Sequence, residues 1–301
     1  MRYTFFIAVL GLLFAAPSSA FAKVNIFACE PEWAALSTEI GGDLVEVYTA
    51  TKAHQDVHYM RAKPSLLAAM RKADLVFCSG ASLESGWLPI LLQKAGKPDV
   101  QQNTVGWLMA SDFVRKLDVM EHVDRSMGHI HPEGNPHVHL NPHNILDIVD
   151  ILTERLFIID QDNGATYDAN ALAFKEKWKQ AIARWKVERE ALKGSNVVVY
   201  HKSWSYLTDW LGMNTIASLE PKPGLPPTTA HLESVLQTLK GKSVKAILVA
   251  PFENDDAAQW LSARTNIPIL RMPYTIGGSD QADTLESLLD ESLSLLGGTS
   301  Q

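Results

Sequence analysis

A long helical stretch in the middle of the chain constrains the fold most, because it lies between two halves that share one pattern. Helical periodicity covers 143–159 and then about 165–193, and only 160–164 interrupts it. A helix of about thirty residues spans roughly 45 Å, which is enough to brace two lobes against each other. The apolar side chains that recur at helical spacing, and so predict a buried stripe, are Phe174, Trp178, Ile182 and Trp185.

Short β-branched runs alternate with helical patterns on both sides of this stretch, which is typical of parallel sheets with crossover helices. In the first half, we expect strands at 24–29, 43–49 and 74–79 and helices at 31–40, 64–72 and 85–95. In the second half, we expect strands at 196–200, 214–219, 244–249 and 267–271 and helices at 203–211, 229–240, 254–265 and 283–296. The predicted fold is therefore α/β, with two parallel-sheet lobes joined by one long rigid helix.

The first residues have the pattern of an export signal. One positive charge, Arg2, precedes an apolar run over 5–16, and 20–22 form an A-x-A cleavage pattern. The run is too short to span a bilayer, and no cysteine stands at the expected cut to carry a lipid. We therefore expect a soluble, periplasmic, monomeric protein without a membrane anchor. The predicted divisions are a signal peptide (1–22), an N-terminal lobe (23–142), a helical linker (143–193) and a C-terminal lobe (194–301).

The two cysteines, Cys29 and Cys78, each end an apolar run that predicts a buried strand. In an oxidising compartment the pair can form a disulfide if those two strands are neighbours. Two buried free thiols are an equally good interpretation of the sequence.

Histidines concentrate at three places: His58, the segment 129–143, which holds five of them, and His201. Imidazole is the commonest protein ligand for zinc and its neighbours. His58 lies between a predicted strand and a helix that begins at Pro64, and His201 directly follows a predicted strand. Loops at the carboxyl ends of parallel strands are where α/β proteins place ligand sites. We expect imidazoles from both halves to converge on one divalent cation in the interlobe cleft; a loosely chelating His-rich tract is the competing interpretation.

The pattern around these histidines resembles the substrate-binding proteins of ABC importers for zinc and manganese, often called the ZnuA/TroA superfamily. In that family the first metal histidine stands six residues before a Pro-Ser pair that opens a helix, as His58 stands before Pro64. The second belongs to a Pro-His-x-x-x-x-Pro segment, matched by 136–142, and the third follows a strand in a Val-x-x-His pattern. The resemblance covers essentially the whole mature chain. It implies metal ligands at His58, His137 and His201 and delivery of the ion to an inner-membrane ABC permease.

The chain departs from this family at the fourth ligand. Many members supply an aspartate after the penultimate strand, where this sequence has Pro273 and Tyr274. Candidate replacements are Glu220, Glu253, His139 or a water molecule, and all of them stay open at this point.

The other histidines of 129–143 have two interpretations of equal weight. They capture zinc weakly and pass it to the main site, or they face solvent and only chelate loosely. The residues concerned are His129, His131, His139 and His143.

The predicted ligand type favours zinc as the bound substrate. Three neutral imidazoles suit zinc better than manganese, which prefers oxygen ligands. Zinc also accepts a tetrahedral site made of three histidines and one further ligand. Manganese or another divalent metal is the alternative within the same family.

Other classes of function fit the sequence less well. A zinc hydrolase would use the same three histidines, but we find no H-E-x-x-H motif, no Gly-x-Ser-x-Gly elbow and no Gly-rich phosphate loop, and we expect no enzyme. The formal net charge of −7 leaves no basic stripe for nucleic acid. A zinc buffer that serves no transporter has the same sequence features as a delivery protein.

Overall fold

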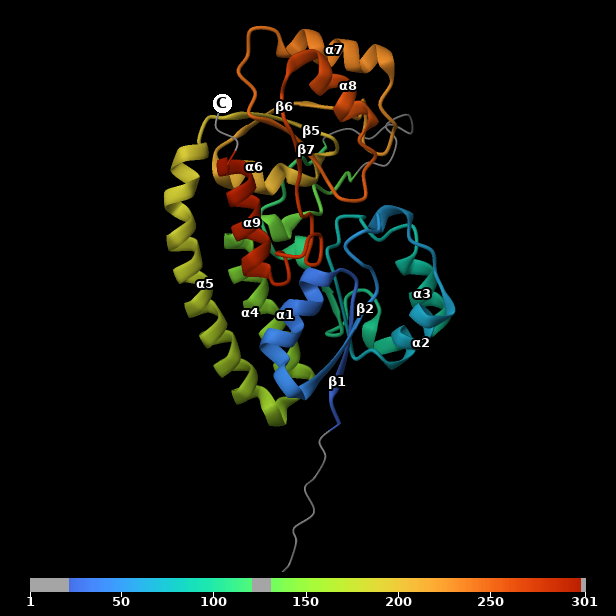
Figure 1. Cartoon of the computed structure of the whole chain (residues 1–301). Helices are drawn as coiled ribbons and strands as arrows, with labels where there is room; N and C mark the ends of the chain where they lie inside the picture. The colour runs from blue at the N-terminus through green and yellow to red at the C-terminus, as the bar shows by residue number, and fades with distance from the viewer. Residues whose placement is uncertain (1–21, 121–130, 299–301) are drawn as a thin grey trace, which may run out of the picture.

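The computed structural model describes residues 22–120 and 131–298 (Figure 1). The predicted signal peptide and His129 lie outside these ranges, apart from Ala22. Within the described ranges, none of the helices combines the length and the apolar character needed to cross a membrane.

The N-terminal lobe is built on a parallel four-stranded sheet with the strand order β2-β1-β3-β4. Its strands are β1 (Val24–Ala28), β2 (Val45–Thr49), β3 (Leu75–Cys78) and β4 (Trp107–Met109). Its helices are α1 (Pro31–Gly41), α2 (Pro64–Lys72) and α3 (Leu88–Ala95). The three predicted strands and three predicted helices are confirmed. The sequence prediction missed β4, because three residues are too few to show a period of two.

The C-terminal lobe repeats this topology with the strand order β6-β5-β7-β8, again all parallel. Its strands are β5 (Asn196–Val199), β6 (Asn214–Ser218), β7 (Ala246–Val249) and β8 (Ile269–Arg271). Its helices are α6 (Ser205–Leu211), α7 (Thr229–Leu239), α8 (Asp256–Thr265) and α9 (Leu285–Gly298). In both sheets the order reverses beside the first strand, and ligands of α/β proteins bind outside the carboxyl ends of the strands near such a point.

Two long helices join the lobes: α4 (Pro142–Ile159) and α5 (Gly164–Leu192), the latter running along the side of the molecule (Figure 1). The buried indole of Trp178 donates to the carbonyl of Pro142 over 2.8 Å, which ties α5 to the start of α4. The indole of Trp185 donates to Asp290 of α9 over 2.6 Å. The predicted long helix and its apolar stripe are therefore confirmed, and the two indoles bond different helices.

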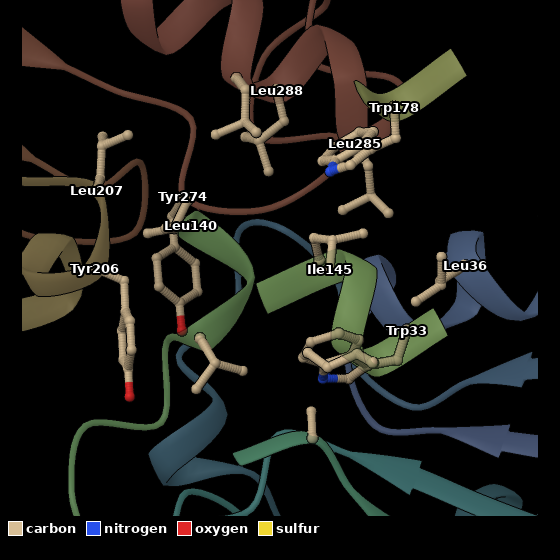
Figure 2. Close-up of a cluster of buried hydrophobic side chains, with 14 of the residues drawn as sticks. Trp33, Leu36, Leu140, Ile145, Trp178, Tyr206, Leu207, Tyr274, Leu285 and Leu288 are labelled. Carbon is tan, nitrogen blue, oxygen red and sulfur yellow. The ribbon is translucent and has the colours of Figure 1, made fainter. Parts of the chain in front are cut away.

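One continuous apolar core spans both lobes, because the sheets present apolar faces to the same set of helices. It includes Phe77 from the first sheet and Leu248 from the second. Figure 2 shows part of it, with Tyr206 of α6 beside Tyr274 on one side and Trp33 and Leu36 of α1 on the other. This shared core fixes the position of one lobe relative to the other.

A disulfide joins Cys29 to Cys78 at the carboxyl ends of β1 and β3, which are neighbouring strands. The two Cα atoms lie 4.8 Å apart, within the range that a disulfide requires. Of the two interpretations that the sequence left open, the structure has the disulfide.

Replacing both cysteines by serine should lower the free energy of unfolding by roughly 2–4 kcal/mol, because the bond closes a long loop in the unfolded chain. Urea denaturation followed by tryptophan fluorescence measures this change. Reduction of the wild-type protein in denaturant should raise its mass by two hydrogens, and an unchanged mass would show that the bond is absent.

Candidate metal centre

The three predicted histidines are held in place by local structure at the cleft face of the lobes. His58 lies in a 3₁₀ turn, Val57–Tyr59, whose cap Asp56 accepts a bond from the His58 backbone N–H over 3.0 Å. His137 is fixed from the backbone too, because the side-chain oxygen of Asn135 accepts from its N–H over 3.0 Å. His201 lies two residues after the end of β5. Each position is set by a short-range feature of the chain.

The structure brings these three side chains together from three distant segments of both lobes. One ring nitrogen of each of His58, His137 and His201 lies within 4.8 Å of the others. The ring centroids are 5.6 to 6.3 Å apart and the rings meet edge to face. Imidazole nitrogens at such separations surround a space suited to a single ion.

Each ring nitrogen Nδ1 bonds a neighbouring oxygen. His58 Nδ1 lies 2.7 Å from Asp56 Oδ1, and His201 Nδ1 lies 2.7 Å from Glu220 Oε2. His137 Nδ1 lies 2.8 Å from the hydroxyl of Tyr274. Metal-binding histidines almost always use their second nitrogen in this way, because the partner fixes the ring and its tautomer. The arrangement leaves Nε2 of each ring to face the common centre.

The surroundings of His137 favour the neutral form of its ring. Its side chain is buried, and its Nε2 has no hydrogen-bond partner within the described part of the chain. Burial, followed by the nearby imidazoles of His201 and His58, lowers the pKa of His137 well below its ordinary value. The ring is therefore neutral at pH 7 and offers a lone pair, which is the form that binds a metal.

The carboxylates considered as fourth ligands each have hydrogen-bond partners of their own. Glu220 accepts from Gly224 N–H over 3.1 Å as well as contacting His201, so it supports a ring. Glu253 accepts from the backbone of Ala250, and burial raises its pKa to about 8.

The third candidate, His139, has other groups close to both of its ring nitrogens. Its Nε2 lies 2.9 Å from the carbonyl of Tyr274, and its Nδ1 lies 3.2 Å from a buried carboxylate oxygen of Glu32. His139 therefore links the two lobes through backbone and side-chain contacts.

The sequence analysis missed two residues of this site. His131 Nε2 lies 3.0 Å from His58 Nε2, although the sequence suggested only a transient or solvent-facing role for His131. Tyr274 stands where the family's aspartate was expected and instead supports His137. The sequence could have drawn attention to Tyr274, because it stands in place of the family's aspartate. Nothing in the local sequence distinguishes His131 from His143, which is exposed.

A buried carboxylate pair lies beside the disulfide, behind the turn that His131 contacts. The N–H of Ser79 donates to Glu84 over 2.9 Å and to Glu30 over 3.1 Å. Burial raises the pKa of Glu84 to about 7, and burial together with Glu84 raises the pKa of Glu30. His131 Nδ1 lies 2.8 Å from the carbonyl of Ala81, in the turn that Glu84 closes.

A family model described as zinc-uptake complex component A, periplasmic, matches residues 26–296. The chain belongs to this family. Membership confirms the resemblance inferred from the sequence. Because the members of this family are transport components, it also confirms the expectation that the chain is not an enzyme.

Curated relatives are metal-binding components of ABC transporters. SsaB of Streptococcus sanguinis, a metal ABC transporter substrate-binding lipoprotein, is 24% identical over 92% of this chain and 89% of its own length. The manganese ABC transporter substrate-binding lipoprotein scaA of Streptococcus gordonii is 24% identical over 85% of this chain and 81% of its own. The zinc-binding lipoprotein AdcA of Streptococcus pneumoniae is 22% identical over 84% of this chain and 48% of its own.

Solved structures confirm the two-lobed fold. A crystal structure of ZnuA superposes with a TM-score of 0.76 at 20% identity, over 93% of this chain and all of that one. A manganese-bound mutant of a periplasmic metal-binding protein from Candidatus Liberibacter asiaticus superposes with a TM-score of 0.75 at 21% identity, over 92% of this chain and 99% of that one. The relatives include proteins named for zinc and for manganese, so the fold is compatible with either metal.

The buried carboxyl of Glu84 should make stability depend on pH. Its folded pKa, about 7, exceeds the ordinary value of 4.5, so the folded protein holds a proton that the unfolded chain has released. This stabilisation is complete below about pH 4.5 and is lost as the pH rises through 7. The free energy of unfolding should therefore fall over this range, and Glu84→Gln should flatten the fall. Urea titrations at several pH values measure it.

Exposed Glu39 on α1 provides the matched control, since Glu39→Gln should leave the pH dependence unchanged. A slope in Glu84→Gln equal to that of the wild type would contradict the assignment.

Proposed function

We propose that this chain binds one zinc ion as its transport substrate, through His58, His137 and His201, and delivers it to an inner-membrane ABC permease. The observation that carries the proposal is the convergence of three imidazole nitrogens from both lobes within 4.8 Å. An ion held in this way is bound by coordination and enclosed between the lobes.

The character of the ligands supports zinc over manganese. Neutral imidazole is a borderline nitrogen ligand that suits zinc, whereas manganese favours carboxylate and carbonyl oxygens. Two carboxylates beside the proposed ligands, Asp56 and Glu220, are each engaged with the Nδ1 of one of them. They therefore raise the basicity of the rings and act on the ion through them.

The proposed setting follows from the sequence. The export pattern at 1–22 supports a periplasmic location for the mature protein, which we propose is a monomer. The proposed divisions are an N-terminal lobe at 23–142, a helical linker at 143–193 and a C-terminal lobe at 194–301. Because the ligands come from the first and third of these parts, zinc binding should stabilise the lobes against separation.

Replacing His58, His137 and His201 together by alanine should abolish tight zinc binding. The wild-type protein should bind one equivalent of zinc and prefer it to manganese. Calorimetry with each metal, together with metal analysis of protein purified without added metal, measures both properties.

His143→Ala is the matched control: His143 is exposed, and this variant should bind zinc like the wild type. A tight equivalent of zinc in the triple variant, or tighter binding of manganese than of zinc by the wild type, would refute the proposal.

Removing the hydroxyl that supports His137 should weaken zinc binding. Tyr274→Phe deletes the partner of His137 Nδ1, 2.8 Å away, in a fully buried setting. Loss of such an outer partner typically costs about 10–100-fold in metal affinity. Competition with a chromophoric chelator measures the change. Tyr48→Phe on β2, far from the centre, is the control, and equal affinity of both variants would contradict a role for Tyr274.

A further inference from the structure

The buried carboxylate of Glu32 is a feature of the molecule that the proposed function leaves unexplained. Glu32 lies in the first turn of α1, and its side chain is buried. We propose that Glu32 and His139 are positioning residues for the metal centre. They hold Tyr274 in place, and Tyr274 in turn holds the ring of His137. This inference rests on the proposed function, because it requires His137 to be a ligand.

Glu32 contacts side chains from two other segments of the chain. Its Oε1 lies 3.2 Å from Nδ1 of His139, which belongs to the 3₁₀ turn Val138–Leu140 just before α4. Its Oε2 accepts a hydrogen bond from the hydroxyl of Thr275, in the segment between β8 and α9. His139 and Thr275 are buried as well. Each oxygen of the carboxylate thus has a buried polar partner, which burial of a charged group requires.

His139 joins the same segments from its own side. Its Nε2 lies 2.9 Å from the carbonyl oxygen of Tyr274, and because a carbonyl only accepts, this nitrogen carries a hydrogen and donates it. Its Nδ1 and the Oε1 of Glu32 have no further hydrogen-bond partner within the described residues, so the contact between them compensates their burial. Removing either side chain would leave the other with an unsatisfied buried atom, which is costly.

These contacts fix the backbone on both sides of the Tyr274 side chain. His139 binds the carbonyl of Tyr274, and Glu32 binds the next residue, Thr275. The rings of Tyr274 and His139 also meet edge to face, with centroids 5.7 Å apart. Tyr274 belongs to the C-terminal lobe, whereas α1 belongs to the N-terminal lobe, so the contacts cross between the lobes.

The hydroxyl of Tyr274 carries this constraint to the metal centre. It lies 2.8 Å from Nδ1 of His137, so the position of the tyrosine sets the position of the ring that it supports. A binding site works only if its ligands are held within about 0.5 Å of the productive geometry. Glu32 and His139 should therefore influence zinc affinity without touching the ion.

A merely structural role makes a different prediction. If Glu32 and His139 only complete the core, replacing them lowers the free energy of unfolding and leaves the zinc affinity of the folded protein unchanged. If they position Tyr274, the affinity falls too, and the fall depends on the hydroxyl of Tyr274.

The test is a double-mutant cycle in zinc affinity on the full chain, measured by competition with a chromophoric chelator and with zinc alone as the probe. His139→Phe should lower the affinity about tenfold, as expected for loss of an outer partner. In the Tyr274→Phe background the same change should have no further effect. Glu32→Asp, which is one methylene shorter, guards against misfolding and should also lose affinity. Glu32→Gln should keep most of it, because an amide can accept from Thr275 and donate to His139.

Ser292→Ala on α9 is the matched control. It removes a buried hydroxyl that bonds only its own helix, at Leu288, and it should leave zinc affinity unchanged. Circular dichroism and urea denaturation without metal establish that each variant is folded.

Two results would overturn the positioning role while leaving the three-histidine centre intact. One is wild-type affinity in both His139→Phe and Glu32→Asp. The other is a tenfold loss in His139→Phe that persists in the Tyr274→Phe background. Absence of tight zinc binding by the wild type would instead overturn the proposed function, and the positioning role with it.

Discussion

The apolar core shared by the two lobes is the constraint on which the rest of the structure depends. Histidines at the ends of separate sheets can approach one ion only if the sheets keep a fixed relation, and burial of large apolar side chains supplies it. Trp178 and Trp185 on α5 contribute most visibly, since each packs in this core and donates a hydrogen bond to a different helix. The proposed centre thus depends on packing far from its candidate ligands.

The proposed metal centre combines rigid supports with candidate ligands that are neutral. Asp56, Glu220 and Tyr274 each hold one imidazole by its Nδ1, and these three partners come from the loops of both lobes. Burial and mutual repulsion keep His137 unprotonated, so proton loss costs little when an ion enters. Because the fold itself occurs in relatives named for zinc and for manganese, ligand chemistry and not architecture has to distinguish the metals.

Much of this organisation could be predicted from the sequence, because its signals are local. Periodicity located seven of the eight strands that the structure describes, together with the long helix. The positions of His58 and His201 after predicted strands predicted that both lie in loops at the carboxyl ends of the two sheets. The fourth strand, at Trp107–Met109, was too short for any pattern. The contacts of His131 and Tyr274 could not be predicted, because each depends on a segment more than 70 residues away, brought near only by the completed fold.

The most direct test of the central claim is a crystal structure of the zinc-loaded protein with anomalous scattering measured at the zinc edge. The account predicts one anomalous peak between the lobes, about 2.0–2.1 Å from Nε2 of His58, His137 and His201 alike. Separate peaks at individual histidines, or a single peak that one lobe alone coordinates, would contradict it.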